Sequence, residues 1–198
     1  PSVERRGLVL MLHGWEGCSH SNYDIMMTDT FTRVGFDVVR LNFRDHGPNR
    51  HVNRYALNRG LFLGTLLEEA AAAVRQIAAM ADGVPLSIVG VSMGGNFALR
   101  LACYHRRQPF VNLAKVIAVN PAVNPARATD LIDGHRVYRH YFRKRWLASL
   151  LAKQELFPAL YAFDGLLALP TIRGMTEWLV RRYQHQTGNF FQTADEYF

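Results

Sequence analysis

The sequence has little of what marks a disulfide-stapled, membrane-spanning or low-complexity protein. It has 198 residues and only two cysteines, Cys18 and Cys103, which are too few for a disulfide framework and favour a reducing compartment. It contains no apolar run long enough to span a bilayer, no low-complexity tract and no internal repeat. Hydrophobic residues make up 49% of the chain and charged residues 20%, which is typical of a folded globular domain. We therefore expect a soluble, cytoplasmic protein, with attachment at a membrane surface as the alternative.

Residues 134–154 contain no acidic residue, and the whole chain carries a formal net charge of +7. The basic residues of this segment are Arg136, Arg139, Arg143, Lys144, Arg145 and Lys153. Such a basic surface can attract nucleic acid or anionic lipid head groups, or can simply be solvated. Because no nucleic-acid motif is present, we expect no nucleic-acid partner. A solvated face is the preferred interpretation, and a weak contact with anionic membranes is the alternative.

Apolar strand-like runs alternate with helix-like segments over residues 1–123. Strands are predicted at residues 8–12, 36–42, 86–91 and 115–120, and helices at 23–34, 63–81 and 96–105. The alternation predicts an α/β fold with a mostly parallel sheet and helices on both faces. Catalytic groups in such sheets lie at the carboxyl ends of the strands, where His13, Ser92 and Asn120 are found.

Ser92 lies in the sequence Gly90-Val-Ser-Met-Gly94, between a predicted strand and a predicted helix. This Gly-x-Ser-x-Gly setting is typical of a nucleophile elbow, a sharp turn that exposes the serine hydroxyl. Gly90 and Gly94 would let the strand and the helix approach closely around the turn. The alternative is a glycine-rich turn with a capping serine. The presence of both flanking elements favours the elbow.

The first predicted strand leads into His13-Gly14-Trp15-Glu16-Gly17. A loop at this place supplies one oxyanion-hole N–H in serine hydrolases, and the residue after the nucleophile supplies the other. We therefore expect the amides of Trp15 and Met93 to be the two donors, with Gly14 and Gly17 letting the loop turn. The alternative is an ordinary strand-to-helix loop held by a buried His13, and we expect His13 to be structural in either case.

These two motifs, together with Leu41-Asn-Phe-Arg-Asp-His-Gly47, resemble the α/β-hydrolase superfamily, and within it the YheT-like and neighbouring predicted hydrolases. The resemblance extends over nearly the whole chain. It implies Ser92 as nucleophile, the amides of Met93 and Trp15 as oxyanion donors, and the loop 44–47 as a structural neighbour of the site. In this family an acid after a later strand and a histidine near the C-terminus complete the triad.

The triad cannot be completed within this sequence. The histidines and the acids considered after Ser92 are His105, His135, His140, His185, Asp130, Asp133, Asp164 and Asp195. None follows a predicted strand in the order that this fold requires. We therefore expect the acid and the histidine to lie outside this chain, which would be the middle of a longer protein and poorly active alone.

Residues 124–186 lack the strand pattern and contain helical spacings, which predict a helical cap after the core of residues 1–123, with residues 187–198 beginning a return to the core. The resulting hypothesis is a serine hydrolase that cleaves a small-molecule or lipid carboxylic ester through an acyl-enzyme, with no metal and no organic cofactor. The alternatives are a non-catalytic binding protein of the same fold and a lipid hydrolase that docks on membranes.

Overall fold

The computed structural model describes residues 4–48, 58–187 and 190–198. The chain divides into two compact units. The first consists of Pro1–Phe43 and Leu66–Val123, and the second of Arg44–Thr65 and Asn124–Phe198.

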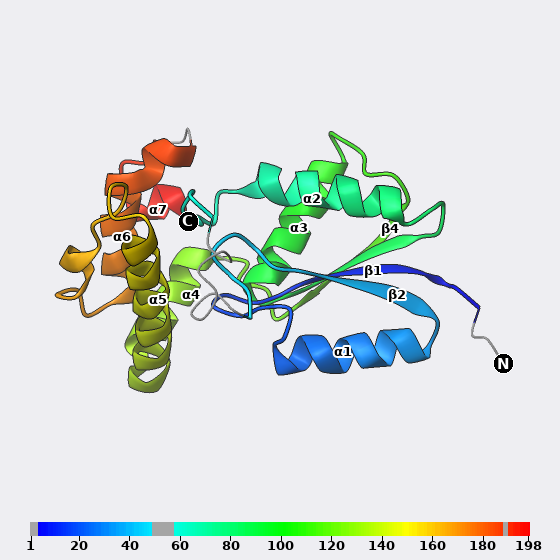
Figure 1. Cartoon of the computed structure of the whole chain (residues 1–198), viewed down its shortest axis with the longest axis horizontal. Helices are drawn as coiled ribbons and strands as arrows, with labels where there is room; N and C mark the ends of the chain where they lie inside the picture. The colour runs from blue at the N-terminus through cyan, green and yellow to red at the C-terminus, as the bar shows by residue number, and fades with distance from the viewer. Residues whose placement is uncertain (1–3, 49–57, 188–189) are drawn as a thin grey trace. The chain divides into compact units, whose positions relative to one another are not determined.

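The first unit is built on a parallel sheet of four strands in the order β2-β1-β3-β4 (Figure 1). The strands are β1 (Gly7–Leu12), β2 (Phe36–Leu41), β3 (Leu86–Val91) and β4 (Leu113–Val119). All six residues of β1 are buried, because this strand lies inside the sheet and has packed layers on both faces. The predicted α/β fold with a parallel sheet is confirmed.

Three helices cover the sheet: α1 (Asn22–Arg33), α2 (Leu67–Met80) and α3 (Met93–His105). On one face, buried Val9, Met11 and Val89 pack against Met27 and Phe31 of α1. On the other face, α3 packs against β1, β3 and β4, and α2 packs on α3 (Figure 1). Helices therefore lie on both faces, as the alternating pattern predicted.

The strand order reverses between β1 and β3. From β1 the chain moves through α1 to β2 on one side, and it later returns to β3 on the other side. Leu12 at the end of β1 is paired with Leu41 of β2 and with Gly90 of β3. In open parallel sheets, ligands bind at such a switch point, outside the carboxyl ends of the strands. His13 and Ser92 follow directly after these two strand ends.

The second unit is helical. Its elements are α4 (Pro125–Gly134), α5 (Arg136–Leu156), the 3₁₀ helix η2 (Asp164–Leu166), α6 (Ile172–Tyr183), the 3₁₀ helix η3 (Gln184–Thr187) and α7 (Ala194–Tyr197). The predicted boundaries after residues 123 and 186 remain predictions, and this division differs from them by grouping 44–65 and 187–198 with the helices. None of the helices in the described ranges combines the length and the apolar character needed to cross a membrane.

The structure corrects the prediction that Lys153 belongs to the basic surface. Its side chain is only 1% exposed, and its ammonium group binds Asp45 at 2.5 Å and the carbonyl oxygens of Asn58 and Gly60 at 2.7 and 2.5 Å. A buried cation is tolerated only when it is paired and hydrogen-bonded, and these contacts meet both conditions. Lys153 therefore fastens Asp45, Asn58 and Gly60 to α5 instead of contributing charge to the surface.

Candidate active site

Ser92 forms by itself the turn between β3 and α3. Its backbone adopts φ 53° and ψ −113°, a left-handed conformation that is strained for a residue with a side chain. The residue is exposed, and within the described part of the chain its hydroxyl has no hydrogen-bond partner. The turn therefore presents an unengaged alcohol to solvent at the carboxyl end of β3.

Backbone hydrogen bonds hold this strained turn in place. The N–H of Ser92 donates to the carbonyl of Val119 at 2.9 Å, and the Ser92 carbonyl accepts from the N–H groups of Asn96 and Ala122 at 3.0 and 3.3 Å. The Asn96 side chain in turn donates to the Ala122 carbonyl at 2.9 Å. The end of β4 and the first turn of α3 thus fix the position of Ser92 from two directions.

Close backbone contacts explain the two glycines that flank the turn. A Cβ atom on Gly90 would lie 2.1 Å from the Gly94 carbonyl oxygen, and one on Gly94 would lie 2.1 Å from the Leu12 carbonyl oxygen. Both distances are far shorter than any real contact, so side chains at either place would push α3 away from the sheet. The helix begins at Met93, earlier than the expected Asn96, and it includes Gly94 and Gly95. Packing of these glycines close to the sheet accounts for the earlier start.

The loop after β1 lies beside Ser92. A Cβ atom on Gly14 would lie 3.5 Å from the Cβ of Ser92. Gly17 donates its N–H to the Gly14 carbonyl at 2.9 Å, which closes the loop into a turn, and Glu16 takes a positive φ of 58° within it. The His-Gly-Trp-Glu-Gly segment and the Gly-Val-Ser-Met-Gly segment are thus brought together, as their positions after neighbouring strands require.

His13 is fully buried beneath this loop. Its Nε2 accepts the backbone N–H of Phe43 at 3.2 Å, so the ring is neutral and its Nδ1 donates to the Gly14 carbonyl at 2.8 Å. The ring also packs edge-on against Phe43, with centroids 5.1 Å apart. These contacts tie the loop to the segment that follows β2.

The two backbone N–H groups that were expected to form an oxyanion hole belong to Met93 and Trp15. The N–H of Met93 is the first of α3, where no intrahelical acceptor exists, and it makes no hydrogen bond to another described residue. Trp15 directly follows Gly14 in the loop. The helix N-terminus also favours negative charge near Met93. The role of the two amides as an oxyanion hole remains a prediction.

Sequence reasoning missed Tyr23, which entered it only as the first residue of the helix predicted at residues 23–34. Its phenol oxygen accepts the N–H of Gly14 at 2.8 Å and lies 3.4 Å from the place where a Gly14 Cβ would be. Burial raises the pKa of Tyr23, so the phenol stays neutral. Its place two residues after Ser21, the N-cap of α1, is the only signal that could have directed attention to it.

Two of the four histidines that follow Ser92 accept backbone N–H groups near helix ends. His105 accepts the N–H of Phe110 at 2.9 Å, and His135 accepts the N–H of Tyr138 at the start of α5. His140 lies on α5, and His185 lies in η3. None of the four follows a strand, in agreement with the context that the sequence predicted.

The four acidic residues considered as triad candidates after Ser92 contact groups other than a histidine. Asp130 and Asp195 both bind Arg173, at 2.6 and 2.8 Å. Asp133 accepts the N–H groups of Ile172 and Arg173, at the start of α6, at 2.7 and 2.9 Å. Asp164 lies within reach of the Gln154 amide. The triad acid therefore stays unassigned.

The residue types that bind metal ions were predicted to form no site in this protein. Over the described ranges, no three side chains of the His, Cys, Asp and Glu types are grouped so as to hold a metal ion. The absence of a cofactor remains a prediction from the sequence.

Comparisons with solved structures give distant likenesses. The ferulic acid complex of Est1E from Butyrivibrio proteoclasticus matches with a TM-score of 0.47 and 18% identity, over 67% of this chain and 49% of that chain. A thermostable carboxyl esterase from Bacillus coagulans matches with a TM-score of 0.44 and 22% identity, over 57% and 35%. A probable hydrolytic enzyme from Pseudomonas aeruginosa PAO1 matches with a TM-score of 0.49 and 16% identity, over 92% and 77%. This chain thus spans about half the length of Est1E.

No curated protein matches the sequence significantly. The family model described as serine aminopeptidase, S33, a hydrolase family, matches residues 3–182. The match contains both glycine-flanked motifs and most of the helical unit. It agrees with the α/β-hydrolase superfamily that the motifs indicated, while the YheT-like placement stays a prediction. The chain therefore belongs to the serine aminopeptidase S33 family of hydrolases.

Proposed function

We propose that this chain carries the nucleophile and the oxyanion hole of a serine hydrolase that cleaves carboxylic esters. The observation that carries the proposal is Ser92 itself, an exposed hydroxyl on a strained turn at the switch point of a parallel sheet. A protein maintains such strain, at a cost of about 1–3 kcal/mol, mainly at functional sites. Membership of a serine hydrolase family supports the same conclusion.

In the proposed reaction the Oγ of Ser92 attacks the ester carbonyl and forms a tetrahedral intermediate, which expels the alcohol and leaves an acyl-enzyme. The N–H groups of Met93 and Trp15 would stabilise the oxyanion, and the positive end of α3 would add to the effect. Each such donor contributes about 2.7–4 kcal/mol of transition-state stabilisation in comparable sites. Water then attacks the acyl-enzyme and releases the acid.

The general base of the reaction is a histidine other than His13 and His105. The Nε2 of His13 and the Nδ1 of His105 each accept a backbone N–H, which removes the free nitrogen that a base near Ser92 needs. No residue of the described ranges is assigned as the base or as its acid partner.

Esters are favoured over amides for a chemical reason. An amine leaves only after general-acid protonation, whereas an alcohol is a better leaving group and depends less on a well-placed acid. Ester cleavage is therefore the less demanding reaction for the same nucleophile. The family description favours a second candidate, the release of N-terminal amino acids from peptides, which the same nucleophile would perform.

The test is covalent labelling by a fluorophosphonate probe in the natural full-length protein, together with hydrolysis of p-nitrophenyl acetate and butyrate and of aminoacyl p-nitroanilides. Labelling that disappears in Ser92→Ala, with turnover of the esters, supports the proposal. Turnover of the anilides alone replaces it with the aminopeptidase. Absence of both labelling and turnover favours a non-catalytic binding protein of the same fold.

The partner proposed for this site is a small-molecule or lipid ester. The sequence predictions of no nucleic-acid partner and of a weak contact with anionic membranes remain predictions.

A further inference from the structure

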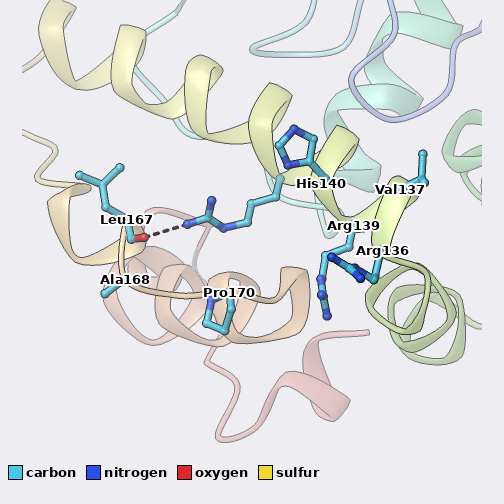
Figure 2. Close-up of a pocket in the computed structure, with 8 residues that line it drawn as sticks. Arg136, Val137, Arg139, His140, Leu167, Ala168 and Pro170 are labelled. Atoms are coloured by element: carbon cyan, nitrogen blue, oxygen red, sulfur yellow. Dashed lines mark hydrogen bonds between the residues drawn. The ribbon is translucent and has the colours of Figure 1, made fainter.

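A groove of about 900 Å³ lies along the first half of α5, within the helical unit (Figure 2). One wall consists of residues from α5, among them Arg136, Arg139, His140 and Arg143. These positions are separated by three, four and seven residues, so they share one face of the helix. The other wall is the segment of residues 167–170, which follows η2.

The cationic side chains of this groove are not neutralised by acids. No Asp or Glu lines it, and across the described ranges Arg136, Arg139 and Arg143 form no ion pair. The nearest acids in the sequence, Asp130 and Asp133, are engaged by Arg173 and by the N–H groups at the start of α6. The groove therefore concentrates positive charge, which only a ligand or counter-ions can balance.

Two of these arginines are held in fixed orientations by backbone carbonyls. Arg143 donates from Nε to the Leu169 carbonyl and from Nη2 to the Leu167 carbonyl, both at 2.8 Å. Arg139 donates from Nη1 to the Asp133 carbonyl at 3.0 Å. Guanidinium groups carry five N–H donors, so each arginine has further donors for an oxyanion. Their side chains are preorganised, which lowers the entropic cost of binding.

Arg136 differs from these two because its guanidinium group has no hydrogen bond to another described residue. Figure 2 shows Arg136 and Arg139 extending from α5 close to one another, with Pro170 and Ala168 across the groove. This arrangement places a hydrogen-bonded guanidinium group, that of Arg139, and one without such a bond, that of Arg136, at one end of the same groove.

The remaining lining is apolar. Val137 and Leu167 are 68% and 53% exposed, and Ala168 and Pro170 complete the opposite wall. Large apolar side chains left in solvent beside arginines suit a ligand that has both an anionic head and a short apolar body.

From this combination we infer that the α5 groove binds a phosphate group carried by a small amphiphilic molecule. A phosphate has about two negative charges near neutral pH and three acceptor oxygens, and arginines bind such groups in bidentate fashion. A single carboxylate would leave most of the three guanidinium charges unbalanced. The phosphate can belong to a phospholipid head group or to a soluble phosphate ester, and the two sources share this chemistry. The inference does not depend on Ser92.

The experiment measures binding to the whole protein at about 0.15 M salt, where interactions between distant surface charges are largely screened. The probes are inorganic phosphate, the water-soluble dihexanoyl phosphatidic acid, and phosphatidylcholine vesicles with and without dioleoyl phosphatidic acid. The groove variants are Arg136→Gln and Arg136→Gln/Arg139→Gln. The matched control is Arg106→Gln/Arg107→Gln, which removes the same charge from exposed positions after α3.

We expect the dissociation constant for dihexanoyl phosphatidic acid to rise about tenfold in the double groove variant and less in the single variant, with no change in the control. Binding of the soluble probe supports a soluble phosphate ester as the source, whereas binding only to the phosphatidic acid vesicles, with the same loss in the groove variants, supports a lipid head group. Equal weakening in the groove and control variants would overturn the inference in favour of general charge. Failure of every probe to bind would overturn it as well. The single variant removes no hydrogen bond of the fold, so its result does not depend on whether the double variant folds.

Discussion

The phenol oxygen of Tyr23 accepts a 2.8 Å hydrogen bond from the backbone N–H of Gly14, in the loop beside Ser92. This bond joins the first turn of α1 to the loop that follows β1. It fixes the His13–Gly14 peptide, which is the neighbour of the Gly14–Trp15 peptide that carries the Trp15 N–H. Tyr23 is therefore a positioning residue for the proposed oxyanion hole, although it is not itself proposed to touch the substrate.

Tyr23→Phe tests this role. The substitution keeps the ring but leaves the Gly14 N–H without its acceptor, which costs about 1–3 kcal/mol when such a donor is buried. We expect the rate of Ser92 labelling by a fluorophosphonate probe to fall about tenfold, because the loop amide is held less firmly. The matched control is Tyr104→Phe, whose hydroxyl binds Glu68 and Gln108 at the exposed end of α3. An unchanged rate in Tyr23→Phe, or an equal fall in the control, would contradict the positioning role.

Gly94→Ala tests the close approach of α3 to the sheet. The new methyl group would lie 2.1 Å from the Leu12 carbonyl oxygen, and backbone on both sides prevents it from moving aside. We expect a loss of at least about 1–3 kcal/mol in the free energy of unfolding, measured by urea denaturation, and slower labelling of Ser92.

The control for this substitution is Gly134→Ala, at the end of α4, where an added Cβ meets nothing within 4 Å. That change should stabilise the protein by about 0.4–1 kcal/mol, since alanine lowers the entropy of the unfolded chain. If both substitutions had the same effect on the urea midpoint, the contact between Gly94 and Leu12 would not be a determinant of the fold.

Local patterns were enough to predict the sheet and the position of Ser92. The apolar runs that became β1 and β3 are short and buried, and the helical spacings between them leave few other arrangements. The neighbourhood of Gly14 and Ser92 follows from the same logic, because both lie directly after adjacent parallel strands. The strands and the turn depend on residues close in sequence, and the meeting of the two loops follows from the order of the strands.

Features that depend on distant partners were not predictable in this way. Lys153 was grouped with surface charges because its neighbours on α5 are basic, whereas its burial depends on Asp45, 108 residues earlier. Tyr23 fits an apolar helix pattern, and nothing local shows that its hydroxyl reaches Gly14. The early start of α3 contradicts the poor helix propensity of Gly94 and Gly95, because packing on the sheet decides there.

The burial of Asp24 leads us to predict that the free energy of unfolding depends on pH. The residue is only 1% exposed, and its Oδ1 has no hydrogen-bond partner among the described residues. Burial raises the pKa of Asp24 to about 6 from its usual 3.8, in spite of the opposing attraction of Arg40. Between these two values the folded protein binds more protons than the unfolded chain, so stability falls as the pH rises. Above the folded pKa the full cost is present, and it is about 3 kcal/mol.

Asp24→Asn removes the buried charge. We expect the variant to be more stable than the natural protein at about pH 7.5, by up to about 3 kcal/mol, with the difference vanishing near pH 4. Urea unfolding at several pH values measures this difference. Asp29→Asn is the control, since Asp29 lies exposed on the same helix and pairs with Arg33. A stability gain that did not change with pH would exclude ionisation of Asp24 as its cause.

The largest loss of stability that we predict for the helical unit follows from substitution of Lys153. In Lys153→Met the aliphatic part of the side chain is retained, but the Asp45 carboxylate and the carbonyls of Asn58 and Gly60 lose their cation. Removing one partner of a buried ion pair costs about 3–5 kcal/mol, because the other charge stays buried and uncompensated. Thermal or urea unfolding of Lys153→Met should show this loss.

The partner substitution separates the pair energy from simple packing. Asp45→Asn keeps an acceptor for the N–H of Phe62, and asparagine tolerates the positive φ of 59° at this position. In the double variant no charge is left buried, so the loss should be smaller than the sum of the two single losses. Lys144→Met, at an exposed position on the same helix, should change stability by no more than about 0.5 kcal/mol. Equal stability of Lys153→Met and Lys144→Met would mean that the ion pair does not hold Asp45 to α5.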